Sequence, residues 1–214
     1  MSKLDISFRE TVLKSDLPSV IQNAGEIGFD SLLDNGVLKD VPILSTMLAI
    51  GKTFGNVRDY FFAKKMLAFL RSISSLSEKK RQKLVDRLDT DEKFGKYAGE
   101  QIIELLSRID SERKAVLVAT ALKLYALEEI DSLQLQRVNY AIDRFILCDV
   151  EEFRSFTTRK RFKDNDPTTA NFINSGLAYT SSHFPDGGIS LNGGICFLNE
   201  TGLLFLRVLE EGLQ

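Results

Sequence analysis

The sequence predicts a mainly α-helical protein, built as a multi-helix bundle with a small C-terminal α+β appendage. The chain has 214 residues but only four prolines, and Leu, Lys, Glu and Ala are frequent, which favours helices. Apolar residues recur at helical spacing through most of the chain, whereas Gly-containing turns and short strand-like segments dominate its end. We therefore expect a helical bundle domain over residues 1–156 and a small α+β tail over residues 157–214.

The N-terminal part is expected to form short helices over residues 5–40, with Pro18 in the first turn of one of them. Pro42 then begins a helical stretch that runs to about Ser75. Gly51 and Gly55 interrupt this stretch, and each costs about 1 kcal/mol relative to Ala within a helix. The sequence therefore leaves open whether residues 41–70 form one kinked helix or two.

Four further helices are expected in the middle of the chain, over residues 77–88, 91–109, 112–127 and 133–147. Thr90, Ser111 and Ser132 come at the start of the last three and are good N-cap residues. The helix after Ser111 is apolar on most of its sides, which is typical of a helix at the centre of a bundle. We expect residues 115–124 to be among the most buried of the chain, together with parts of residues 43–70.

The character of the sequence changes after about Phe156. The segment TTRKRFKDNDPTT is polar and basic, and we expect a linker or an exposed loop there. A short helix is predicted from Pro167 to Asn174, with Gly176 ending it. The segment ISLNGGICFLN predicts a β-hairpin, and Asn199 is the expected N-cap of a last helix up to Glu211.

The end of the tail resembles that of many winged-helix domains. In those domains a strand runs into the pattern LTxxGxxFLxxL, and residues 197–206 here read FLNETGLLFL. A short helix and a Gly-turned hairpin precede the pattern, as in that family. The resemblance implies a winged-helix-like tail and nucleic-acid binding.

A looser resemblance concerns residues 41–70, which read VPILSTMLAIGKTFGNVRDYFFAKKMLAFL. This stretch looks like part of the uncharacterised bacterial helical proteins that accompany phage-defence genes. The resemblance implies a role in a bacterial defence or stress system. It transfers no site residues to this chain.

Residues 41–70 are also the most apolar and aromatic-rich part of the chain, although cations interrupt them. The pattern fits a core helix with snorkelling lysines, an amphipathic helix on a membrane, or a surface that binds protein. In the first case Phe54, Phe61, Met66 and Leu67 pack against other helices of the same molecule. In the other two cases the candidate surface consists of Lys52, Phe54, Arg58, Tyr60, Phe61, Lys64 and Lys65.

A second candidate is the basic run at the start of the tail, which consists of Arg159, Lys160, Arg161, Phe162 and Lys163. Cations can bind phosphates, and an aromatic ring can stack on a base. The net charge of the whole chain is −2, so attraction to nucleic acid has to come from such a local patch.

Catalytic and metal-binding motifs are missing from the sequence. It has one His, no HExxH, no GxSxG and no CxxC pair. We therefore predict no enzyme, no cofactor, no metal site and no small-molecule substrate. The first hypothesis is a non-enzymatic helical interaction or adaptor protein in the cytoplasm, with peripheral membrane attachment left open. Its partner is a protein or a second copy of the chain; the alternatives are membrane association through residues 41–70 and winged-helix-type nucleic-acid binding.

Overall fold

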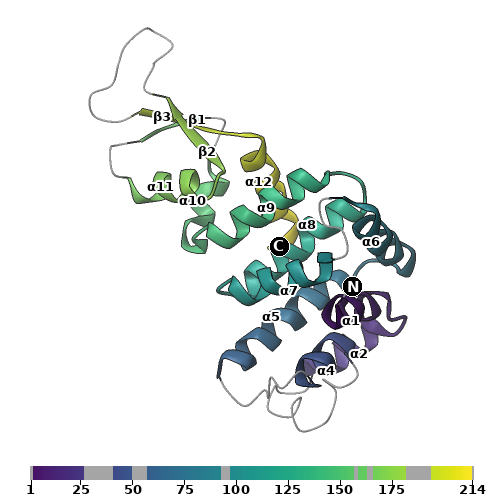
Figure 1. Ribbon diagram of the computed structural model, residues 1–214. Coiled ribbons are helices and arrows are strands. Elements are labelled where there is room, and N and C mark those ends of the chain that lie inside the picture. The colour runs from purple at the N-terminus through teal and green to yellow at the C-terminus, as the bar shows by residue number, and fades with distance from the viewer. Residues whose placement is uncertain are drawn as a thin grey trace. The chain divides into compact units, whose positions relative to one another are not determined.

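The computed structural model describes residues 2–26, 41–49, 57–92, 97–156, 159–162, 166–181 and 194–213. Helices make up most of these residues, and one three-stranded antiparallel sheet forms near their C-terminal end (Figure 1). The predicted fold class, mainly α with a small C-terminal α+β appendage, is confirmed.

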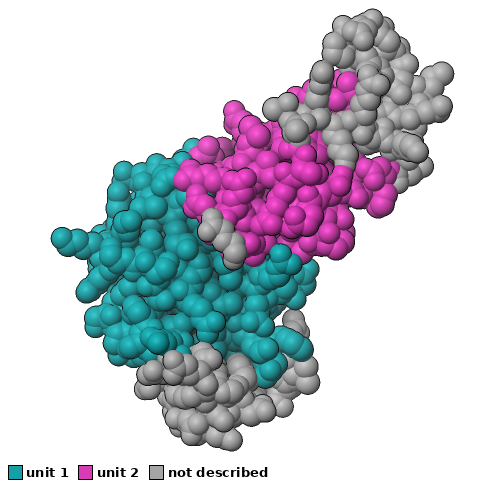
Figure 2. Space-filling view, turned by 180° about the vertical axis from the view of Figure 1, so that it is seen from behind, with its two compact units in different colours: residues 1–132 teal, residues 133–214 magenta. Residues whose placement is uncertain are grey.

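The structure divides into two compact units, residues 1–132 and residues 133–214 (Figure 2). The sequence pattern puts the division later, after residue 156. Residues 133–156 group with the C-terminal unit because the rings of Phe145 and Phe153 pack on those of Phe172 and Phe205. Since a sequence pattern shows which residues are apolar but not what they contact, it cannot assign this segment to either unit.

The N-terminal unit contains seven described helices. They are α1 (Lys3–Leu13), α2 (Leu17–Glu26), α4 (Pro42–Ala49), α5 (Val57–Ser74), α6 (Glu78–Thr90), α7 (Ala98–Arg108) and α8 (Glu112–Ala126). Pro18 lies in the first turn of α2, as predicted. Ser111 is the N-cap of α8, and its hydroxyl accepts a hydrogen bond from the backbone N–H of Lys114.

Helix α8 is the centre of this unit. Of residues 115–124, only Val116 and Lys123 are not fully buried, which confirms the predicted core segment. Helix α5 packs along α8 and contributes Ala63, Met66 and Phe69 to the same core. Two hydrophobic faces that meet in this way remove much apolar surface from water, which is the main stabilising term of a fold.

The predicted start of the helix before α8 is wrong. Thr90 ends α6 and does not cap a helix from residue 91, because its hydroxyl donates to the carbonyl of Asp86 one turn earlier. Thr can use its hydroxyl in either way, and its sequence context does not decide between them. Helix α7 begins only at Ala98.

Helix α7 approaches α1 closely at Gly99. A Cβ atom at this position would lie 2.9 Å from Asp5 Oδ1 and 2.9 Å from Phe8 Cβ. The backbone N–H of Gly99 donates to Asp5 Oδ1 at 2.9 Å, and Arg9 pairs with the other oxygen of that buried carboxylate. The missing side chain therefore allows a buried hydrogen bond between the two helices.

The C-terminal unit combines short helices with the sheet. Its helical elements are α9 (Ser132–Arg144), a 3-10 turn (Leu147–Asp149), α10 (Val150–Arg154), α11 (Pro167–Asn174) and α12 (Glu200–Gly212). Gly176 has a φ of 72° just after α11, and the Asn199 side chain accepts from the N–H of Gly202 at the start of α12. Both predicted helix boundaries are confirmed.

The sheet has the strand order β1–β3–β2, with β1 at Arg159–Phe162, β2 at Ala178–Ser181 and β3 at Gly194–Leu198. Residues 159–162 therefore form a strand, and the predicted loop at this place is wrong. Strand β3 pairs with β1 on one side and with β2 on the other. The first strand of the predicted hairpin, at residues 189–191, lies outside the described residues. Charged residues on an edge strand hide its strand character from a sequence pattern.

Candidate nucleic-acid interface

One face of the sheet brings together residues from all three strands. The register pairs Phe197 with Tyr179 on one side and with Arg159 on the other. The neighbouring row consists of Ser181, Ile195 and Arg161. Residues opposite one another in neighbouring strands share a face, so these two rows form one surface, which we call the basic–aromatic face.

Two stacked aromatic rings mark this face. The Tyr179 and Phe197 rings lie with their centroids 5.4 Å apart and their planes 19° apart. Tyr179 is 54% exposed, whereas Ala178 and Cys196, which alternate with this pair, are buried on the other face. Phe197 is half-buried and Ile195, in the neighbouring row of the same face, is buried, so the exposed aromatic surface is that of Tyr179.

Positive charge gathers on the neighbouring edge strand. Residues 133–214 contain eight Lys and Arg residues, and four of these lie within residues 159–163. By the alternation of a strand, positions 159 and 161 belong to the basic–aromatic face and position 160 to the opposite face. Two arginine positions thus lie beside the aromatic pair.

The predicted site residues are only partly brought together. Arg159 and Arg161 share a face, but Phe162, the residue expected to stack on a base, pairs with Gly194 and takes a position on the other face. Lys163 lies outside the described residues. Tyr179 and Phe197 supply the aromatic part instead, and sequence reasoning missed them because the partners of β3 come from segments far away in the chain.

The first candidate surface, in residues 41–70, is described in part, and of its described side chains only that of Lys65 is buried. Lys52 and Phe54 lie outside the described residues, and Arg58 belongs to the first turn of α5. The ring of Phe61 is 56% exposed and meets the ring of Tyr60 edge-on, with centroids 5.4 Å apart. The expected burial of Phe61 is therefore wrong, whereas that of Met66 is confirmed and Leu67 is half-buried.

The two described lysines of this surface have different environments. Lys64 lies over the Tyr60 ring and 3.6 Å from Glu112 Oε1; the hydrogen bond with Tyr60 and the charge of Glu112 raise its pKa. Lys65 is buried, and its Nζ donates to the carbonyls of Ile109 at 2.7 Å and Ser107 at 3.3 Å. Its charge stabilises the C-terminal end of α7, where carbonyls lack helical partners.

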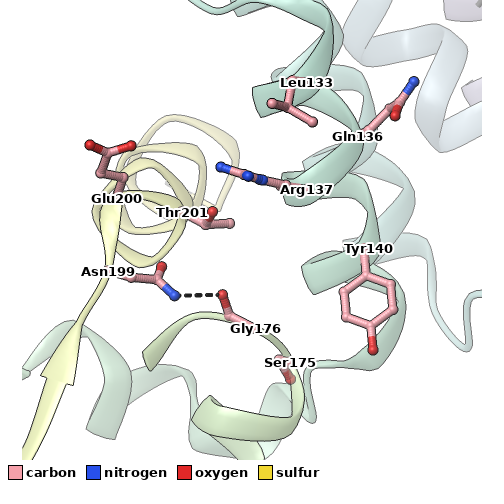
Figure 3. Close-up of a pocket in the computed structure, with 9 residues that line it drawn as sticks. All are labelled: Leu133, Gln136, Arg137, Tyr140, Ser175, Gly176, Asn199, Glu200 and Thr201. Atoms are coloured by element: carbon pink, nitrogen blue, oxygen red, sulfur yellow. Dashed lines mark hydrogen bonds between the residues drawn. The ribbon is translucent and has the colours of Figure 1, made fainter. Parts of the chain in front are cut away.

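A pocket lies in the C-terminal unit, between α9, the end of α11 and the start of α12 (Figure 3). Its volume is about 520 Å³, and its lining residues are Leu133, Gln136, Arg137, Tyr140, Ser175, Gly176, Asn199, Glu200 and Thr201. Asn199 Nδ2 donates to the Gly176 carbonyl at 2.9 Å across its floor. Arg137 and Glu200 are both exposed; the Arg137 side chain extends from α9 towards Thr201, whereas the Glu200 carboxylate points away from the pocket (Figure 3).

None of the described helices is both long and apolar enough to span a membrane. Nor does the described part of the chain bring together three or more His, Cys, Asp or Glu side chains that could hold a metal ion.

The chain matches no protein-family model, and no similar curated protein or solved structure was found.

Proposed function

We propose that this protein is a non-enzymatic nucleic-acid-binding protein whose contact surface is the basic–aromatic face. The observation that carries the proposal is the Tyr179–Phe197 stack, with Tyr179 exposed, in the same row as position 159 and next to the row of position 161. Arginines bind phosphate oxygens, and exposed aromatic rings stack on bases. A surface with both groups side by side suits a ligand with both phosphates and bases.

The charge distribution supports a local contact. Residues 133–214 carry ten acidic residues against eight basic ones, so the unit as a whole does not attract a polyanion. The cations of residues 159–163 have to act at short range. We therefore expect moderate affinity with a clear salt dependence, since each phosphate contact releases counterions.

The resemblance to winged-helix domains supports the same proposal. The matching residues, 197–206, span the end of β3 and the first half of α12. The resemblance thus concerns the segment that carries Phe197, although the arginines and Tyr179 come from elsewhere in the unit.

The experiment is a fluorescence-anisotropy titration of a labelled oligonucleotide at about 50 mM salt, where phosphate contacts are strong. The test variant is Arg159→Ala with Arg161→Ala. The matched control is Lys79→Ala with Lys80→Ala, which removes the same charge from exposed positions of α6. We expect a loss of about tenfold or more in the test variant and less than about twofold in the control.

Two results would refute this proposal. One is the absence of binding at low salt by the unaltered protein. The other is an equal loss in both double variants, because the attraction would then come from overall charge and not from the sheet.

A second candidate function is the helical adaptor, and the exposed ring of Phe61 favours it. The Tyr60 and Phe61 rings and Lys64 form a small mixed surface on α5. Light scattering over a range of protein concentrations, with and without anionic liposomes, tests this candidate. If Phe61→Ser leaves the scattering unchanged in both series, the α5 surface carries neither self-association nor lipid binding.

A further inference from the structure

We propose that the nucleic acid bound by the basic–aromatic face is single-stranded, with phosphates along β1 and one base stacked on the outer side of the Tyr179 ring. This inference rests on the proposed function and adds the class of nucleic acid and the role of each residue.

The stacked pair has one available ring face. Phe197 is half-buried and covers one side of Tyr179, because the two rings lie nearly parallel. Tyr179 is more than half exposed and belongs to the edge strand β2, so its other side is open to a flat ligand. A base that stacks there forms a three-membered stack with the rings of Tyr179 and Phe197.

Positions 159 and 161 lie on the same face of the sheet as Tyr179, but at the other end of the rows, on β1. Neighbouring strands are about 4.8 Å apart, so β1 lies about 10 Å from β2. Positions 159 and 161 are separated by about 7 Å along β1, since each strand residue advances about 3.4 Å. A single strand can therefore contact β1 with its phosphates and cross the sheet over β3 and β2, so that the base of a later nucleotide reaches the outer side of the Tyr179 ring.

This arrangement excludes a duplex from the stacking contact. In a duplex the faces of the bases are covered by their neighbours, and only base edges are exposed in the grooves. An aromatic ring on a sheet can stack only on a base that has left the helix, which is the usual state in single strands and loops. The exposed ring on a flat surface hence favours single-stranded DNA or RNA.

Tryptophan provides a site-specific probe, because the chain contains none. In Tyr179→Trp the only indole lies at the proposed stacking position, and a stacked base should quench its fluorescence. The matched control is Tyr140→Trp in α9, because Tyr140 is 52% exposed and so almost equal to Tyr179 in exposure. Both variants are titrated with an unlabelled oligothymidine of about 12 nucleotides, within the usual site size of such surfaces.

Affinity measurements separate base stacking by Tyr179 from phosphate contact by Arg159. We expect Tyr179→Ala to weaken single-strand binding about 5- to 150-fold, the usual range for loss of one stacked base, and Tyr179→Phe to retain it. The salt dependence should stay unchanged in Tyr179→Ala. In Arg159→Ala the slope of log K against log salt should become shallower by about 0.7, as expected for one lost phosphate contact.

The outcomes distinguish this inference from the proposed function. Quenching in Tyr179→Trp but not in Tyr140→Trp, with weaker binding of the annealed duplex than of its separate strand, supports both. Equal affinity for duplex and single strand, or equal affinity of Tyr179→Ala and the unaltered protein, overturns the inference while arginine-dependent binding remains. If the unaltered protein binds neither single-stranded nor duplex oligonucleotide, the proposed function itself is refuted. Arginine-dependent binding of anionic vesicles in place of oligonucleotides also overturns both.

Discussion

The α5 segment and the basic–aromatic face are both rich in aromatic residues and cations, but they use them differently. In α5, Phe62 and Phe69 are buried, Lys65 caps α7, and Lys64 lies between Tyr60 and Glu112. On the sheet, Tyr179 is exposed on one edge strand, and the cations belong to the sequence of the other edge strand, β1. Similar composition therefore leads to a core element in one unit and to a candidate binding surface in the other.

The difference follows from the geometry of the elements. A helix within a bundle can turn most of its side chains towards neighbours, and long lysine chains reach polar partners around its rim. A small sheet packs one face on helices and leaves the other to solvent.

The largest effect is expected at the buried lysine of α5. Lys65→Ala removes the donor for two carbonyls at the end of α7 and leaves a cavity beside them. We expect the free energy of unfolding to fall by about 2–4 kcal/mol. Urea denaturation measures this value, with Lys64→Ala as the control, because a half-exposed ion pair contributes about 0–1 kcal/mol. If both variants lose the same stability, Lys65 is not the buried cap described above.

The next largest loss of stability is expected at Gly202 in α12, where the chain packs closely against the backbone of Leu177. A Cβ atom at Gly202 would lie 2.2 Å from the backbone carbonyl oxygen of Leu177, which cannot swing away as a side chain can. We expect Gly202→Ala to reduce the free energy of unfolding by about 2–3 kcal/mol. It should also weaken oligonucleotide binding, because α12 and β3 follow one another in this unit.

Gly99→Ala is the matched variant in the N-terminal unit, with Cβ contacts of 2.9 Å to side-chain atoms. It should destabilise the protein, as judged by urea denaturation, without changing the affinity of the folded protein for an oligonucleotide. A loss of affinity in Gly99→Ala at a temperature where the protein is folded would contradict the assignment of binding to the C-terminal unit.

A smaller effect concerns a buried aromatic–cation pair. The Tyr125 hydroxyl donates to Asp91 Oδ2 at 2.8 Å, and Arg87 lies 4.0 Å from the centre of its ring. Burial, and then the interaction with Asp91, raises the pKa of Tyr125 above its usual value. The folded state therefore holds this proton more tightly than the unfolded state does, and its contribution is complete below about pH 10 and declines above it.

Tyr125→Phe should lower the free energy of unfolding by about 1 kcal/mol at neutral pH, since one hydrogen bond is lost. It should also flatten the decline of stability above about pH 10. Chemical denaturation at several alkaline pH values measures both. An unchanged alkaline decline in Tyr125→Phe would show that other groups cause it.

The smallest effect on stability is expected at the exposed ring of α5. Phe61→Ser removes a side chain that is more than half exposed, so we expect a change within about 0.5 kcal/mol. Thermal unfolding measures the shift. A loss above about 2 kcal/mol would mean that Phe61 is packed in solution, which removes the observation that favours the adaptor function.

Local signals in the sequence predict the helix ends well. Ser111, Gly176 and Asn199 mark boundaries because their side chains or their backbone conformation act within one turn. Thr90 is the instructive exception, since the same hydroxyl can cap a helix or bond back to the preceding turn.

Contacts between distant segments are not predictable in this way. The cap formed by Lys65 joins residues more than 40 positions apart, and β3 pairs with strands that begin at residues 159 and 178. The register of these strands decides which residues share a face, and a shift by one position would exchange the two faces. For this reason the sequence identifies the cations of the candidate site but misses Tyr179 and Phe197.

Amide hydrogen exchange with and without a single-stranded oligonucleotide reports on α5 and on the sheet in one measurement, and so shows which of them binds. We expect slower exchange in peptides that cover residues 159–162, 178–181 and 194–198, and unchanged exchange across α5. Slower exchange confined to α5, with no change in the three strands, would contradict it.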